Sequence, residues 1–194
     1  MIGLQRHTVR IVEHDPAWSE LYAAEARGLR AAAGGLLLDV QHVGSTAVAG
    51  LPAKPILDIA VAVQTRATIP GLVQRLTASG YLDRGDGGDN GGYLLVKDSA
   101  PEVRTAHLHI VAVADPQWHD YLAFRDRLRV DCGLRNAYAA LKRALALRFA
   151  DDRKSYTAGK EEFIRKALAR PAAERAAGGV ARPFGVPALS RNSL

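Results

Sequence analysis

A single acidic residue, Asp58, interrupts an otherwise apolar segment at residues 56–63, which reads ILDIAVAV. Apolar runs of this kind are typical of strands that are covered on both faces of a sheet. Because an isolated charge is costly to bury, Asp58 must be paired with a cation, hydrogen-bonded or bound to a metal ion. Lys54, which lies between Pro52 and Pro55, is one candidate partner. A structural salt bridge near the end of the strand is the alternative.

Strand and helix patterns alternate along the rest of the chain. Strands are expected at residues 36–43, 56–63, 93–97 and 105–113, and helices at 16–33, 68–79, 116–130, 134–149 and 155–169. This order predicts an α+β fold with α/β-like layering, in which helices flank a mixed sheet and a helical segment ends the domain. Residues 83–92 contain five glycines and predict a solvated loop. The spacing of its aspartates does not match an EF-hand calcium loop.

Composition bounds the domain organisation. The chain has 194 residues, of which 48% are hydrophobic and 24% charged, as in an ordinary globular domain. After residue 170 the sequence becomes rich in Ala, Gly, Pro and Arg without periodicity, so we predict one domain at residues 1–170 and a flexible tail at 171–194. Cys132 is the only cysteine, which excludes an intramolecular disulfide and fits a reducing cytoplasm. No secretion signal or membrane-spanning run is visible, so we expect a cytoplasmic protein without a membrane partner.

The net charge of +6 favours phosphate-bearing partners. The basic residues are spread along the chain, without a block of five like charges. We therefore do not expect nucleic acid to be the main partner.

The sequence HVGST at residues 42–46 ends the first long predicted strand. Gly44 allows a ligand to approach the backbone closely, and Ser45 and Thr46 supply hydroxyl groups. If a helical turn begins here, its free N–H groups form an anion site. We predict that Gly44, Ser45 and Thr46 contact a phosphate group. The alternative is a tight turn with a Ser or Thr helix cap.

Two histidines, His107 and His109, alternate with apolar residues in the predicted strand at 105–113. Side chains two residues apart in a strand lie on one face, about 7 Å apart at Cα. Such a pair is suited to chelating a divalent ion. A polar stripe that faces solvent is the equal alternative.

Basic residues in two predicted helices form a further candidate set. Arg125 and Arg129 are four residues apart in FRDRLR and share a helix face, and Lys160 lies in YTAGK. Beside a phosphate, such arginines form a clamp, because the guanidinium fork matches phosphate oxygens. Alternatively, Asp126 and Asp131 neutralise them as solvated surface charges.

Six ordered blocks resemble the GrpB family, a nucleotidyltransferase-like group. They are DPAW from residue 15, HVGSTAV from 42, KPILDIAV from 54, HLHI from 107, LAFRDRLR from 122 and YTAGKEEFI from 156. The resemblance extends from about Val9 to Ala169 and leaves out the tail. It implies a polymerase-β-type nucleotidyltransferase core, in which a Gly-Ser turn and an acidic strand hold a nucleoside triphosphate with magnesium.

The resemblance assigns roles residue by residue. Gly44 and Ser45 match the Gly-Ser turn, and Asp58 matches the first acidic position of the strand, whereas Ala60 stands at the second. The implied catalytic residues are Ser45, Lys54 and Asp58. The implied nucleotide and phosphate contacts are Gly44, Ser45, Thr46, Lys54, Arg125, Arg129 and Lys160, and the implied metal ligands are Asp58, His107, His109 and His42.

The missing second carboxylate affects which metal ions the site could hold, because one aspartate cannot bridge two cations. Imidazole ligands would shift the preference from magnesium toward manganese, zinc or iron. The resemblance therefore implies a divalent metal, Mg²⁺ or Mn²⁺ or else a transition metal. ATP or another nucleotide would be the substrate, and a small molecule would accept the nucleotidyl or phosphoryl group or be activated as an acid.

Two other functions remain open at this stage. One is a nucleotide-binding accessory module without catalysis, connected with coenzyme A, since GrpB domains resemble those fused to dephospho-coenzyme-A kinases. The other is a metal-dependent hydrolase built on Asp58, His107 and His109. The sequence does not identify the acceptor or the oligomeric state.

Overall fold

The computed structural model describes residues 1–87 and 92–169, so the predicted tail at 171–194 lies outside the described residues. The strands are β1 (Leu4–Gln5), β2 (Asp39–Val43), β3 (Leu57–Val63), β4 (Leu82–Asp86), β5 (Tyr93–Ala100) and β6 (Val103–Ala112). The α-helices are α1 (Ala17–Ala33), α2 (Ile69–Ala78), α3 (Pro116–Val130), α4 (Cys132–Arg148) and α5 (Arg153–Ala169). Short 3-10 turns at Ser45–Ala47 and Arg66–Thr68 follow β2 and β3.

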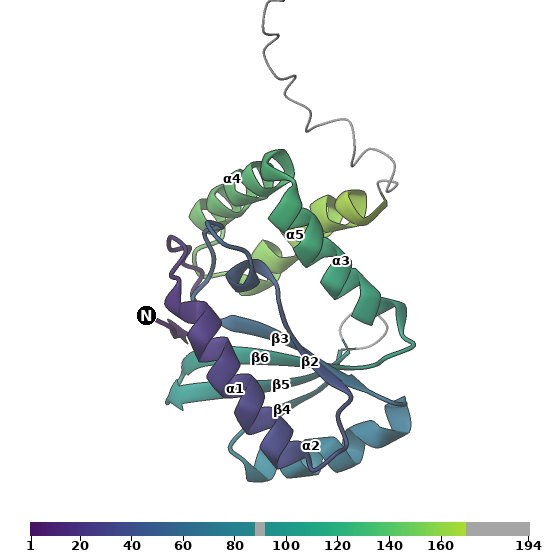
Figure 1. Ribbon diagram of the computed structural model, residues 1–194. Coiled ribbons are helices and arrows are strands. Elements are labelled where there is room, and N and C mark those ends of the chain that lie inside the picture. The colour runs from purple at the N-terminus through teal and green to yellow at the C-terminus, as the bar shows by residue number, and fades with distance from the viewer. Residues whose placement is uncertain (88–91, 170–194) are drawn as a thin grey trace, which may run out of the picture.

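The strands form one mixed sheet in the order β2-β3-β6-β5-β4, and β1 pairs with β6. β3 and β6 run parallel, whereas the other paired strands are antiparallel. Figure 1 shows α1 and α2 on one face of the sheet and α3, α4 and α5 on the other. The predicted architecture, a mixed sheet flanked by helices with a helical segment at the C-terminal end of the domain, is confirmed.

Alternate residues of β3 belong to different layers, because side chains in a strand point to opposite faces in turn. Ile59 and Val61 are fully buried in the larger core, with residues of α1 and α2. Ala60 is fully buried in a smaller cluster that includes Trp118 of α3. Asp58 shares the face of Ala60, so the single acid of this strand points toward the layer of α3, α4 and α5.

The two last helices pack closely against each other. Gly159 of α5 has so little space that a side chain there would lie 2.6 Å from Leu145 Cδ2 of α4. A third apolar cluster joins these helices to the segment after β2 through Leu51, Tyr138 and Ala167. The helical layer is thereby fixed to the turn that carries Ser45.

Residues 82–86 form the edge strand β4, so the prediction of a loop over residues 83–92 is wrong in its first part. The side chains of β4 are mostly exposed, so no alternation of apolar and polar residues marks the strand in the sequence. Its backbone nevertheless pairs with β5, with an irregularity between Asp83 and Gly85. Pairing with β5 overrides the local preference of glycine for loops here. Residues 88–91 of the predicted loop lie outside the described residues.

The other differences concern boundaries and membrane spans. β2 begins at Asp39 rather than at residue 36, and β5 continues to Ala100 rather than 97. The two-residue strand β1 was not predicted. In the described part of the chain, no helix combines the length and the apolar character needed to cross a bilayer.

Candidate functional site

The turn after β2 brings its backbone against the side chain of Asp58. Gly44 has φ 66° and ψ −165°, a conformation that residues with a side chain almost never adopt. A Cβ atom on Gly44 would lie 2.6 Å from Asp58 Oδ2 and 2.9 Å from Asp58 Cβ. Glycine is therefore required here both by backbone conformation and by space. The contact places Ser45, the next residue, beside Asp58.

Asp58 and the histidine pair lie on the same face of the sheet. The register pairs Asp58 with His107 on the neighbouring strand β6. His107 Nδ1 lies 3.0 Å from Asp58 Oδ1, and His109 Nε2 lies 4.0 Å from the same oxygen. Burial raises the pKa of Asp58, but its interactions with His107 and His109 outweigh burial and hold the pKa well below its usual value. Asp58 is therefore an ionised carboxylate.

His107 connects Asp58 to an arginine of α5. Burial lowers the pKa of His107 to about 4, so its imidazole is neutral at physiological pH. A neutral ring that donates from Nδ1 to Asp58 keeps a lone pair on Nε2. Nε2 lies 3.5 Å from Arg153 Nη2, which is a donor only. The hydrogen bonds thus lead from Arg153 to His107 and from His107 to Asp58.

Three lysines surround the Ser45 turn. Lys142 of α4 is only 2% exposed and donates to Ser45 Oγ at 2.8 Å and to the backbone oxygen of Pro52. Lys54 precedes β3 and lies over the ring of Tyr156, with Nζ 5.1 Å from the ring centroid. Lys160 contacts the same ring, at 4.8 Å. Two of the three ammonium groups are thus held against one aromatic ring of α5.

The charge of one carboxylate, Asp58, raises the pKa of each of these lysines, so three cations face a single nearby negative charge. Burial, followed by the charge of Lys160, lowers the pKa of Lys142 to about 7 and that of Lys54 to about 8. Burial also lowers the pKa of Lys160. Within residues 1–87 and 92–169, none of the three forms an ion pair, in contrast to Lys97 and Lys166. Because buried cations are stable only when neutralised, the cluster is suited to a polyanion.

Two predicted site residues point to the other face of the sheet. His42 pairs with Ile59 in the β2–β3 register and stacks on Tyr22 of α1 at 4.6 Å. Its Nε2 lies 2.9 Å from Thr46 Oγ1, and burial lowers its pKa to about 4. The structure therefore separates His42 and Thr46 from Asp58, and the prediction that they join the metal and phosphate contacts is corrected.

The two arginines of α3 are occupied by protein oxygens. Arg125 is buried and donates to Gln41 Oε1 at 2.8 Å and to the His42 backbone oxygen at 3.1 Å. Arg129 donates to the Ala47 backbone oxygen from two nitrogens, at 3.2 and 3.0 Å. Both also contact Asp126. They brace β2 and the turn after it, so the predicted phosphate clamp is not formed by Arg125 and Arg129.

The donor set does not fit a resident metal. His107 has one nitrogen on Asp58 and the other facing the Arg153 guanidinium, whose charge repels a metal cation. At the second acidic position, Ala60 is fully buried in the cluster of Trp118. Among the described residues, no group of three or more His, Cys, Asp and Glu side chains is arranged to hold a metal ion. The structure therefore brings Asp58, His107 and His109 of the predicted ligand set together, without the arrangement that a metal requires, and turns His42 to the other face of the sheet.

The sequence analysis missed Lys142, Arg153 and Tyr156 as site residues. Lys142 is 97 residues away from Ser45 in the chain, so no local pattern links them. The one available signal is the helical spacing of Arg153, Tyr156 and Lys160, at i, i+3 and i+7, which places all three on one face of α5.

Comparison with solved structures defines the class of fold. The chain is similar to the Cid1 poly(U) polymerase bound to MgGTP, with a TM-score of 0.50 and 15% identity, over 71% of this chain and 45% of that one. At this identity the similarity concerns the fold alone. The chain therefore has a nucleotidyltransferase-like fold.

The family is shown directly by sequence. The family model described as GrpB protein matches residues 8–170, so the chain belongs to the GrpB family. It is 38% identical to the UPF0157 protein PA4798 of Pseudomonas aeruginosa over 84% of this chain and 67% of the relative. The crystal structure of GrpB from Enterococcus faecalis has a TM-score of 0.73 and 34% identity, over 81% of this chain and 94% of that one.

Some relatives are much longer than the matched region. The chain spans 47% of the UPF0157 protein YqkA of Bacillus subtilis, to which it is 30% identical. It likewise spans 47% of a dephospho-CoA kinase of Mycolicibacterium paratuberculosis, at 32% identity. The GrpB fold therefore forms about half of some larger proteins.

We predict that Gly44→Ala lowers the free energy of unfolding by about 2–5 kcal/mol, as expected from adding backbone strain to a steric clash. Urea unfolding measures this loss. Gly50→Ala in the same loop is the matched control, because Gly50 has φ 73° but open space around its Cβ position. It should cost only about 1–2 kcal/mol. An equal decrease in the free energy of unfolding in both variants would contradict the contact between Gly44 and Asp58.

We also predict that the protein alone does not bind Mn²⁺ tightly. Calorimetric titration of MnCl₂ into metal-free protein should give no binding stronger than about millimolar, since fewer than three ligands converge. Stoichiometric Mn²⁺ binding that disappears in His107→Ala would show that the imidazole of His107 binds a metal ion in place of Arg153. It would contradict the conclusion that the donor set does not fit a metal.

Proposed function

We propose that the lysines around the Ser45 turn bind the phosphates of a nucleoside triphosphate such as ATP. The proposal rests on one observation, the three lysines around Ser45 whose positive charge exceeds the single negative charge of Asp58. A triphosphate supplies the missing negative charge, and its oxygens accept the hydrogen bonds that the ammonium groups offer. Any magnesium that accompanies the nucleotide belongs to the substrate.

The reaction class that fits this arrangement is transfer of a nucleotidyl or phosphoryl group to a small molecule. An acceptor oxygen forms a bond to phosphorus while the bond from that phosphorus to its leaving oxygen breaks. Attack at the α-phosphorus releases pyrophosphate, and attack at the γ-phosphorus releases the nucleoside diphosphate. The acceptor proton passes to Asp58, which is ionised and lies next to Ser45.

The lysines account for most of the catalytic effect in this proposal. Transfer of a phosphoryl group depends mainly on positioning and on stabilising negative charge. Lys142 and Ser45 would hold one phosphate, and Lys54 and Lys160 would neutralise the charge that develops on the leaving oxygens. Asp58 has a low pKa and is a weak base, so its main effect is to orient the acceptor hydroxyl.

A second candidate function is nucleotide binding without transfer. It is favoured by the fully buried Ala60 at the second acidic position, which leaves one carboxylate on this face of β3. The two candidates share the nucleotide site and differ in whether product forms. Incubation with ATP and a panel of small hydroxy and carboxylic acids, followed by detection of pyrophosphate and ADP, separates them. The metal-dependent hydrolase has less support, because both ring nitrogens of His107 are engaged, Nδ1 by Asp58 and Nε2 by Arg153.

We predict that ATP binds to the wild-type protein and that Lys142→Met weakens binding by about 10–100-fold, because a charged hydrogen bond is lost in a buried place. Isothermal titration calorimetry with MgATP measures the dissociation constant. Lys142→Met should unfold at the same temperature as the wild type or higher without nucleotide, since a buried, unpaired charge is removed.

The matched control is Lys166→Met on α5, because Lys166 is 71% exposed and pairs with Glu162. It removes the same charge and should change ATP affinity less than twofold. The proposal would be contradicted if the wild type failed to bind ATP at millimolar concentration. It would also be contradicted if Lys142→Met and Lys166→Met lost ATP affinity equally.

We predict that ATP affinity decreases as the pH rises above 7. The free lysines lose their protons around pH 7 and 8, and a bound polyphosphate raises both pKa values, so binding takes up protons. The association constant should fall by up to about tenfold per pH unit for each lysine that titrates. Calorimetry in Tris and Hepps buffers, whose ionisation enthalpies differ, should show this proton uptake at pH 8. An affinity that is constant from pH 7 to 9 would contradict it.

A further inference from the structure

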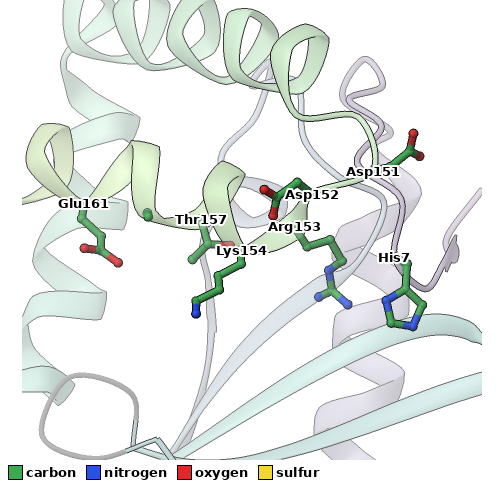
Figure 2. A pocket seen from close by; sticks show the side chains of 8 residues that line it. His7, Asp151, Asp152, Arg153, Lys154, Thr157 and Glu161 are labelled. Atoms are coloured by element: carbon green, nitrogen blue, oxygen red, sulfur yellow. The ribbon is translucent and has the colours of Figure 1, made fainter.

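A cavity lies at the start of α5, around Arg153. It has a volume of about 630 Å³, which is within the range of about 300–1,000 Å³ typical of sites for small molecules. It lies between the first half of α5 and the turn that carries His7 (Figure 2). None of the residues predicted to form the site contributes to its wall.

Arg153 is the residue of this cavity that most needs a ligand. Its side chain is half-buried, and within the described residues it forms no ion pair with a carboxylate; its hydrogen-bond partner is the neutral ring of His107. Burial lowers the pKa of Arg153, and the charges of Arg104 and Arg6 lower it further. A guanidinium group in such surroundings is stabilised by an anion that reaches it from the cavity.

Figure 2 shows in which direction the side chains of the cavity wall extend. His7, Arg153 and Lys154 extend to the same side, toward the strands, whereas the carboxylate of Asp151 extends the other way. Asp152 accepts a hydrogen bond from the Ser155 backbone N–H at 3.0 Å, so its charge is used in capping α5. Arg153 is thus flanked by His7 and Lys154, and Glu161 adds a carboxylate at the end of the cavity far from His7.

The turn that carries His7 is held in an uncommon conformation. His7 has φ 70°, which residues with a side chain seldom adopt. Backbone hydrogen bonds on both sides fix it, from Arg6 N to Glu102 O at 2.7 Å and from Val9 N to Ala150 O at 2.6 Å. Strain of this kind persists where the surrounding structure imposes it, and it often occurs at ligand sites. The turn presents the imidazole of His7 to the cavity.

Arg153 also connects the cavity with the nucleotide site. Through His107 it is one hydrogen bond removed from Asp58, the residue that orients the acceptor in the proposed reaction. On α5 it shares a helix face with Tyr156 and Lys160, which stand against the phosphates in that proposal. Arg153 is therefore the residue through which the cavity is linked to the proposed nucleotide site.

We propose that this cavity binds the acceptor, and that the acceptor is a small anion whose carboxylate or phosphate group is held by Arg153. This inference rests on the proposed nucleotide site, since it names the second substrate of the same reaction. Carboxylate and phosphate present the same pair of oxygens to a guanidinium group. His7 and Lys154 contribute further donors at the mouth of the cavity.

The test is calorimetric titration of succinate and, separately, of inorganic phosphate into protein saturated with the non-hydrolysable nucleotide MgAMPPNP. Saturation fills the lysine cluster first, so that added phosphate cannot bind there. The wild type should bind one equivalent of at least one anion. Arg153→Gln should weaken this binding at least tenfold and change AMPPNP affinity less than threefold. Arg153→Lys, which keeps the charge without the fork, should give an intermediate loss and serves if Arg153→Gln does not fold.

Arg165→Gln on the same helix is the matched control, because Arg165 is 70% exposed and pairs with Glu162, and it should leave both affinities unchanged. Binding of succinate alone identifies a carboxylate acceptor, and binding of phosphate alone identifies a phosphate-bearing one. The proposal is overturned if neither anion binds, if Arg153→Gln binds it normally, or if Arg153→Gln weakens AMPPNP tenfold, since the cavity then holds part of the nucleotide. If the wild type fails to bind AMPPNP but still binds an anion through Arg153, the nucleotide site fails and the anion site stands.

Discussion

The contact between Gly44 and Asp58 determines the geometry of the whole candidate site. It brings the backbone after β2 within van der Waals distance of the acidic side chain of β3, which only a glycine allows. The same side chain is fixed from the other side by His107 on β6. Three neighbouring strands thus meet at one carboxylate, and Ser45 is placed where a lysine of α4 can reach it. A looser turn would separate the hydroxyl group from the charges that surround it.

Burying the charged lysines around this turn lowers the stability of the protein. This loss of stability helps to identify which cations serve a function. Lys142 is nearly inaccessible to solvent, and its pKa near 7 shows how poorly the surroundings solvate its charge. Proteins retain such groups where a ligand compensates them, because stability and function impose opposing demands on a site. Arg125 provides the contrast, since it is also buried but has several oxygen acceptors. Burial of a cation is therefore not by itself a sign of function. A buried cation that has no acceptor of opposite charge is a candidate for ligand binding.

Sequence reasoning identified the parts of the site that depend on local patterns. The apolar run around Asp58 and the alternation around His107 each predict a strand, and the structure pairs these two residues in register. Helical spacing could not show which face of α3 is turned inward, so Arg125 was predicted to bind phosphate although it braces β2. Lys142 could not be predicted, because its position depends on how α4 packs against a loop far away in the sequence. Pairing between distant elements decides such positions, and local propensity does not encode it.

The absence of a second carboxylate and the presence of the lysines have a common structural basis. Ala60 lies under Trp118 of α3, and an aspartate in its place would be buried in an apolar cluster at a cost of several kcal/mol. The side of the sheet that could hold a second metal ion is therefore closed by α3. Beside Ser45, in contrast, Lys142 of α4 donates to the hydroxyl group, and Lys160 of α5 lies over the ring of Tyr156. Ammonium groups neutralise phosphate oxygens without requiring carboxylates to hold them, so this packing favours a site in which lysines take over charge stabilisation that a pair of metal ions would otherwise supply.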